Sequence, residues 1–193
     1  MKITTADGPA FFIRTAYLRC VDPALLVPAA EFSDEKELDI LSAGECFAAE
    51  RQALSYLARA EQSRFGLVRK LSAKGMQKDH ISAALDYLES IRYLSDSRYA
   101  AAWLNSRKAS HHEGRVRLAA ELASRGIDRH TAQETLDAYF EENPEEEECI
   151  RAAEKCVRLG MVYEKALRSL VLHGFTAASA SFALETLGIK KSR

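Results

Sequence analysis

One seven-residue pattern occurs three times in this chain and constrains its fold more than any other feature. It reads KLSAKGM at 70–76, ELASRGI at 121–127 and SLVLHGF at 169–175. The three glycines, Gly75, Gly126 and Gly174, lie 51 and then 48 residues apart. Repetition at such a period indicates supersecondary units arranged in tandem. We therefore expect a mainly α protein built from three related units.

Each of these glycines is expected to end a helix. A leucine stands four positions before it, and an apolar residue follows it directly. Glycine adopts the left-handed backbone conformation that commonly ends a helix, and the next residue then packs back on the last turn. The following residue, Gln77, Asp128 or Thr176, would begin the next helix; Asp and Thr are good N-caps and Gln is a poor one.

The residues around each glycine predict three helices per unit, nine in all, of about 11–16 residues each. After Gly75, one helical face is apolar; its residues are Ile81, Ala84, Leu85, Leu88 and Ile91. A helix is expected before each pair, at about 47–60 with Leu54 and Leu57 facing inward, from Ser95 or Asp96 onward, and from Pro144 onward.

The first helices of the second and third units carry further signals. We expect the second unit to place four residues of its first helix along one side: Tyr99, Ala102, Trp103 and Ser106. In the third unit we expect Asn143 to be the N-cap and Pro144 the first helical residue, with the acidic run 145–148 in the electropositive first turn.

The first 45 residues have a different pattern. Two β-prone segments flank Gly8 and Pro9, which predicts a small hairpin, and Ser33 begins a short helix with Leu38 and Leu41 as its apolar residues. We divide the chain into this segment, 1–45, and three-helix repeats at 46–93, 94–141 and 142–193. Each repeat is too small to bury a core alone, so we expect neighbours to stack into an elongated, curved array.

Nothing in the sequence indicates catalysis, a cofactor or a metal. No phosphate-binding glycine loop or nucleophile motif occurs, and the adjacent His111 and His112 would diverge by about 100° on a helix. The four cysteines form no CxxC pair and are expected to be small buried thiols. No apolar run approaches the roughly 20 residues that span a bilayer, so we expect a cytoplasmic protein.

Arginine is the distinctive residue type of the middle of the chain. Residues 48–140 carry fifteen basic and eleven acidic side chains, whereas residues 1–47 carry four and eight. Because guanidinium groups pair bidentately with carboxylates and phosphates, this excess indicates an anionic partner surface. The candidate partner-binding residues are Arg64, Arg69, Lys70, Lys74, Arg98, Arg107, Lys108, Arg115, Arg117 and Arg125. Four of them are expected to be dispensable for folding: Arg98, Arg107, Arg115 and Arg117.

Three stretches within 48–140 carry a resemblance to a known family: ALSYLARAEQSRFGLVRKLSAKG at 53–75, LSDSRYAAAWLNSR at 94–107 and GRVRLAAELASRGI at 114–127. The second resembles a Leu-x-Asp-x-Arg-[Phe/Tyr]-Ala signature through Leu94, Asp96, Arg98, Tyr99 and Ala100. Their order resembles the RecX family, regulators of the RecA recombinase. Arg115 stands where that family usually has proline, and the third repeat lacks the Asp-x-Arg-Tyr element.

The resemblance implies a non-enzymatic regulator that lies along the groove of the RecA–single-stranded DNA filament. It implies inhibition of strand exchange, ATP turnover and filament growth, and hence a role in DNA recombination, DNA repair and the SOS response. The implied partner is the RecA filament, with weak contact to single-stranded or duplex DNA as a further option. We expect the protein itself to be a monomer.

Two other functions remain open from the residues. A helix–glycine–helix corner with flanking arginines is similar to a helix-turn-helix DNA-binding motif, although the helix that would read DNA, from about Asp128, is acidic. The repeats would also suit a general scaffold for other proteins.

The repeat pattern generates a prediction about stability. Leu122 stands four residues before its glycine, where we expect a buried side chain. Leu122→Ala should therefore lower the free energy of unfolding by about 2–5 kcal/mol. Chemical denaturation of parent and variant measures this difference, and a change below about 1 kcal/mol would place Leu122 outside the core.

Overall fold

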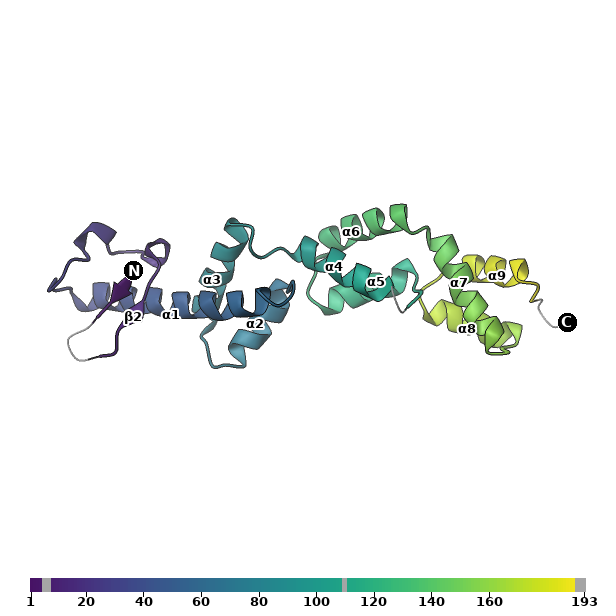
Figure 1. Cartoon of the computed structure of the whole chain (residues 1–193), viewed down its shortest axis with the longest axis horizontal. Helices are drawn as coiled ribbons and strands as arrows, with labels where there is room; N and C mark the ends of the chain where they lie inside the picture. Colours follow the sequence, from purple (N-terminus) through teal and green to yellow (C-terminus); the bar gives the residue numbers. More distant parts are fainter. Residues whose placement is uncertain (5–7, 109–110, 190–193) are drawn as a thin grey trace. The chain divides into compact units, whose positions relative to one another are not determined.

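The computed structural model describes residues 1–4, 8–108 and 111–189, and the chain forms two compact units, residues 1–95 and 96–193 (Figure 1). The described residues contain nine α-helices: α1 Asp34–Leu57, α2 Arg64–Ser72, α3 Lys78–Ser90, α4 Asp96–Lys108, α5 Arg115–Ser124, α6 Arg129–Glu142, α7 Glu145–Arg158, α8 Tyr163–Leu172 and α9 Ala177–Thr186. The prediction of a mainly helical protein is confirmed.

A two-stranded hairpin opens the first unit. Strand β1, Lys2–Ile3, pairs antiparallel with β2, Phe11–Phe12. The hairpin prediction is confirmed, and its residues 5–7 lie outside the described part. So short a ribbon is not stable alone, and the residues after β2 anchor it: Ile13 and Tyr17 are buried against Ala43 and Cys46 of α1.

One helix replaces two that were predicted in the first unit. The expected short helix after Ser33 and the expected helix at 47–60 are a single helix, α1, of 24 residues. The predicted boundary between residues 45 and 46 falls within it. Gly44, a weak helix former, lies next to the predicted boundary. A Cβ at Gly44 would lie 2.7 Å from a ring carbon of Phe11. The glycine therefore lets the hairpin segment approach the helix. Leu38 and Leu41, expected to be its apolar face, are exposed.

The three glycine corners have the predicted geometry. The φ angles of Gly75, Gly126 and Gly174 are +81°, +80° and +91°. At each corner an apolar residue follows the glycine, and its N–H donates at 3.2–3.3 Å to the carbonyl of the leucine that stands four residues before the glycine. This is the hydrogen bond of a Schellman helix end. The side chains of Asp128 and Thr176 cap the next helices, whereas that of Gln77 makes no cap hydrogen bond.

Each repeat has its own buried cluster. Helices α1–α3, α4–α6 and α7–α9 each surround a separate set of apolar side chains, centred on Leu71, Leu122 and Leu170. The expectation that repeats need their neighbours to complete a core is therefore wrong. Alanines at the helix crossings, such as Ala53, Ala100 and Ala153, explain this, because small residues let three short helices pack closely.

In α4 the residues Tyr99, Ala102, Trp103 and Ser106 lie along one side of the helix, as predicted. Tyr99 and Trp103 lie at the edge of the core, and Ala102 and Ser106 are exposed. One local prediction about the third repeat is wrong. The Asn143 side chain does not cap α7. Its amide donates at 2.8 Å to the carbonyl of Tyr139 and so closes the end of α6, and Pro144 precedes the first residue of α7. The acidic run does occupy the first turn of α7, as predicted.

Within the second unit, the second and third repeats meet at two glycines. The N–H of Gly114 donates to the carbonyl of His173 at 2.8 Å. A Cβ at Gly174 would lie 2.5 Å from the backbone nitrogen of Arg117, and one at Gly114 would lie 2.4 Å from the carbonyl oxygen of Gly174. Backbone packs directly on backbone here. Gly174 is thus required both for its positive φ and for this close approach.

This contact generates a prediction that separates the two requirements. Gly75→Ala places a Cβ at positive φ in open space, and it should cost about 1–2 kcal/mol of unfolding free energy. Gly174→Ala adds the clash with the backbone of Arg117 and should cost clearly more. Urea denaturation of both variants measures the difference. Equal losses would show that the two repeats do not pack closely through Gly174.

Candidate partner-binding surface

Arg64, the first of the predicted binding residues, joins two helices of the first repeat. Its two terminal nitrogens donate to Glu89 and Asp86, each at 2.7 Å, and one also donates to Ser82 at 3.3 Å. All three acceptors belong to α3, whereas Arg64 begins α2. The guanidinium is therefore occupied in holding α2 against α3.

The other three predicted residues of the first repeat are exposed: Arg69, Lys70 and Lys74. The guanidinium of Arg69 lies 5.9 Å from the ring centre of Phe65. The ammonium of Lys70 donates to the side-chain oxygen of Gln62 at 2.6 Å and lies 5.0 Å from the ring centre of Tyr56. Among the described residues, none of these three cations has a carboxylate partner.

In the second repeat, Arg107 and Arg117 converge on one buried carboxylate. Arg107 donates two hydrogen bonds of 2.7 Å to the two oxygens of Glu113, whose side chain is 4% exposed. The Nε of Arg117 lies 2.6 Å from Glu113 without hydrogen-bond alignment, so this contact is an ion pair. Arg117 also donates to the carbonyl of Leu172 at the end of α8, at 3.1 Å.

The two arginines decide the ionisation of Glu113. Burial alone would raise the pKa of this carboxyl, but the hydrogen bonds and charge of Arg107, together with the charge of Arg117, lower it below its ordinary value. The hydrogen bonds to Glu113 in turn raise the pKa of Arg107. The cluster is therefore fully charged at neutral pH, and it joins α4 to α5.

Arg115 and Arg125 are also paired within the second repeat. Arg115 forms an ion pair with Asp137 of α6 and lies 4.9 Å from the ring centre of Phe140. Arg125 pairs with Glu121 at 2.6 Å and lies 4.4 Å from the ring centre of Trp103. Trp103, which is partly buried at the edge of the core, thus lies beside the guanidinium groups of both Arg107 and Arg125.

The ten predicted residues are divided between the two compact units. Arg64, Arg69, Lys70 and Lys74 belong to the first unit and the other six to the second. Two of the six residues in the second unit are exposed: Arg98, which has a partner within the chain, and Lys108. That four arginines are dispensable for folding stays a prediction; Arg107, Arg115 and Arg117 each pair with a carboxylate within the second unit.

Sequence reasoning missed a second buried carboxylate, in the acidic run of α7. Glu148 is 2% exposed in its side chain, lies 2.7 Å from His112, and accepts a hydrogen bond from Arg151 at 2.6 Å. Glu145 accepts from the backbone N–H of Arg115 at 2.7 Å. Two of the four acidic residues therefore tie the third repeat to the second, which no pattern in the run itself revealed.

A third polar cluster, also missed, ties the N-terminal segment to α1. Glu50 is buried and accepts two hydrogen bonds from Arg14 and one of 2.8 Å from the hydroxyl of Tyr17. Burial and the neighbouring Glu50 raise the pKa of Tyr17. At Asp39, burial opposes ionisation, but hydrogen bonds from the backbone N–H groups of residues 19–21 lower the pKa of its carboxyl. Only the β-prone pattern signalled that this segment would be ordered.

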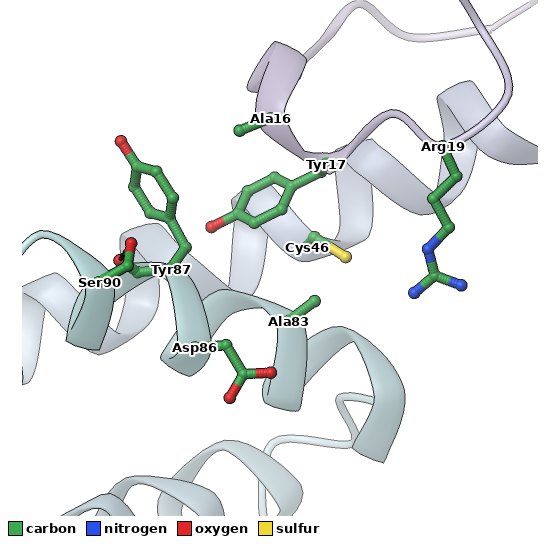
Figure 2. Close-up of a pocket in the computed structure, with 8 residues that line it drawn as sticks. All are labelled: Ala16, Tyr17, Arg19, Cys46, Ala83, Asp86, Tyr87 and Ser90. Atoms are coloured by element: carbon green, nitrogen blue, oxygen red, sulfur yellow. Dashed lines mark hydrogen bonds between the residues drawn. The ribbon is translucent and has the colours of Figure 1, made fainter.

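A hollow of about 300 Å³ lies beside this cluster in the first unit (Figure 2). Tyr17 and Cys46 face it on one side, and Ala83, Asp86, Tyr87 and Ser90 of α3 line the other. Two of its polar groups are already engaged, since Tyr17 donates to Glu50 and Asp86 accepts from Arg64. Burial raises the pKa of Cys46, so its thiol is protonated at neutral pH. The wall thus offers no activated nucleophile.

The residues that the structure describes contain no group of three or more His, Cys, Asp or Glu side chains placed to hold a metal ion. They also contain no helix with the length and apolar character to cross a membrane. Three of the four cysteines, Cys46, Cys149 and Cys156, are buried thiols as predicted, and Cys20 is exposed.

Two protein-family models match the first and second repeats. A family model described as "RecX, first three-helix domain" matches residues 49–88, and one described as "RecX, second three-helix domain" matches residues 95–136. A protein of Treponema pallidum (strain Nichols) named "Regulatory protein RecX" is 34% identical over 158 residues, which cover 81% of this chain and 96% of the relative. One of Neisseria meningitidis (strain FAM18) with the same name is 30% identical over 135 residues, covering 69% and 87%.

Two solved structures share the fold. One is titled "Crystal structure of regulatory protein RecX"; it is 19% identical with a TM-score of 0.73, covering 86% of this chain and 83% of that one. The other is a RecX from Lactobacillus salivarius, 22% identical with a TM-score of 0.66, covering 76% and 98%.

The Glu113 cluster generates a prediction about stability and pH. Because the pKa of Glu113 is lower in the folded than in the unfolded chain, its stabilising effect is complete above its ordinary pKa of 4.5 and is lost as the pH falls through the folded value. Glu113→Gln should lower the unfolding free energy by about 1–3 kcal/mol at pH 7. The gap to the parent should narrow below about pH 4.5.

Glu147→Gln is the matched control. Glu147 pairs with Arg151 while its side chain is 59% exposed, so its loss should cost about 0–1 kcal/mol. Chemical denaturation of the three proteins at neutral and acid pH supplies the comparison. A gap for Glu113→Gln that did not change with pH would contradict the assigned cluster.

Proposed function

Because the chain belongs to the RecX family, we propose that it is a non-enzymatic regulator that binds the RecA–single-stranded DNA filament and inhibits it. The observation that carries this proposal is the identity of 34% with a regulatory protein of this family along 96% of that protein's length. The proposed consequences are slower filament growth, strand exchange and ATP turnover. The proposed location is the cytoplasm, and the proposed active form is a monomer.

Two compact units in one chain suit a filament as the partner. A filament presents the same surface repeatedly, so each unit can contact a different subunit of it. Once one unit has bound, the other acts at a high effective concentration, and two weak contacts then give a strong one. No single large interface is needed.

The ion pairs divide the proposed contact residues by role. Lys108 and the three exposed cations of α2 (Arg69, Lys70 and Lys74) have no carboxylate partner among the described residues, so their charges are available to an anionic surface. Arg64, Arg107, Arg115 and Arg117 act chiefly through the fold, by fixing the helices that present the others. Arg98 and Arg125 would contribute through the exposed parts of their side chains.

A helix-turn-helix DNA-binding role has less support. The helix that would enter the major groove is α6, and its exposed side carries the carboxylates of Glu134, Asp137 and Glu141. Asp137 is neutralised by Arg115, but the other two would face DNA phosphates. No observation on the fold favours the third option, a general scaffold.

The test is the rate of ATP hydrolysis by RecA on single-stranded DNA, measured against increasing amounts of this protein. We expect the rate to fall along a saturable curve. The control replaces RecA by an unrelated DNA-stimulated ATPase, whose rate should not change. A rate of RecA hydrolysis unaffected by folded protein in excess would refute the proposed inhibition. Equal inhibition of both enzymes would indicate competition for DNA.

A further inference from the structure

The helix α2 of the first repeat carries an unusual concentration of unneutralised charge. Arg69 and Lys70 lie in its last turn and Lys74 follows directly. All three are exposed, and among the described residues none meets a carboxylate. Arg64 at the start of α2 already neutralises Asp86 and Glu89, the acidic residues that α3 turns toward it. The positive charge further along α2 is therefore left uncompensated.

The equivalent helix of the second repeat is different. Counted back from the glycine corner, Lys70 corresponds to Glu121, and Lys74 corresponds to Arg125, which pairs with that same Glu121. Arg69 corresponds to Ala120. In the second repeat Arg107, Arg115, Arg117 and Arg125 pair with its own carboxylates. In the third repeat Arg168 holds the position of Arg69, but Ser169 and His173 hold those of Lys70 and Lys74. The full set of three cations at these positions is therefore particular to the first repeat.

Aromatic rings accompany two of these cations. Phe65 is 44% exposed, and the guanidinium of Arg69 lies over its ring. The ring of Tyr56, near the end of α1, lies beside the ammonium of Lys70. In the third repeat the position of Phe65 is held by Glu164. Flat rings and guanidinium planes beside free cations are the combination on which unpaired nucleic-acid bases stack while the backbone phosphates are neutralised.

We propose that this surface, formed by Tyr56, Phe65, Arg69, Lys70 and Lys74 and called the α2 surface, binds single-stranded nucleic acid. The cations contact successive phosphates, and the exposed face of Phe65 or the Arg69 guanidinium stacks on a base. Single strands are favoured over duplex because the bases of a duplex are not free to stack on a ring. They are favoured over acidic peptides because a peptide carboxylate makes no use of the rings. This binding does not depend on RecA.

The test is the binding of a fluorescein-labelled oligothymidylate to the full-length protein, followed by fluorescence anisotropy at several salt concentrations. The variant is the triple substitution Arg69→Gln, Lys70→Gln, Lys74→Gln. Its dissociation constant should rise about tenfold or more at low salt. The slope of log affinity against log salt should become less negative by about two units, since three phosphate contacts are lost at about 0.7 each.

The matched control removes three exposed cations elsewhere. Lys155→Gln, Lys165→Gln and Arg168→Gln changes the net charge equally within the third repeat, and it should leave the slope near that of the parent. Phe65→Leu keeps an apolar side chain but removes the ring. It should weaken single-strand binding about fivefold or more and leave duplex binding unchanged. Circular dichroism confirms that every variant is folded.

Three outcomes would overturn the proposal. The triple variant could bind the oligonucleotide as the parent does. The control variant could lose as much affinity as the triple variant, which would indicate attraction by net charge alone. Polyglutamate could bind the α2 surface while the oligonucleotide does not, which would assign the surface to an acidic protein. The RecA hydrolysis assay is separate, so failure of either proposal is visible without the other.

Discussion

The fold depends on a backbone constraint at three helix corners. A residue without a Cβ must stand where the chain turns left-handed, at Gly75, Gly126 and Gly174. The reversal lets the residue after each glycine bond back to the carbonyl of a buried leucine, so the same few atoms end one helix, direct the next and anchor both to the core. Each three-helix cluster forms around this point, which explains why repeats with few identical residues share one architecture.

Charge pairing gives the repeats different roles on that common architecture. In the second repeat, the buried Glu113 and the exposed Asp137 hold the arginines, and the resulting pairs join α4 to α5 and α5 to α6. In the first repeat one arginine does this work and the remaining cations of α2 face solvent. A count of basic residues alone points to the second repeat, whereas the charge that remains after internal neutralisation points to the first.

The fold was largely predictable because its signals are local. Glycine position, leucine spacing and the Asp128 and Thr176 caps depend on neighbours within one turn, and the structure confirms them. The error at α1 involves a contact between distant residues, since Phe11 packs against Gly44 in the middle of that helix. The error at Asn143 is local, since its side-chain amide donates to the carbonyl of Tyr139 one turn earlier. The site was less predictable, since exposure of an arginine depends on whether a carboxylate such as Glu113 lies opposite.

The buried Glu50 couples the N-terminal segment to the first repeat. Its carboxylate is held in a low-dielectric environment by Arg14 and Tyr17, which lie more than thirty positions earlier. Loss of either donor would leave the buried carboxylate with an unpaired charge. Replacement of Arg14, Tyr17 and Glu50 together by apolar residues would leave no buried charge. Related sequences should therefore keep all three residues or replace all three together. Such correlated variation would identify the relatives in which the N-terminal segment packs on α1 in the same way.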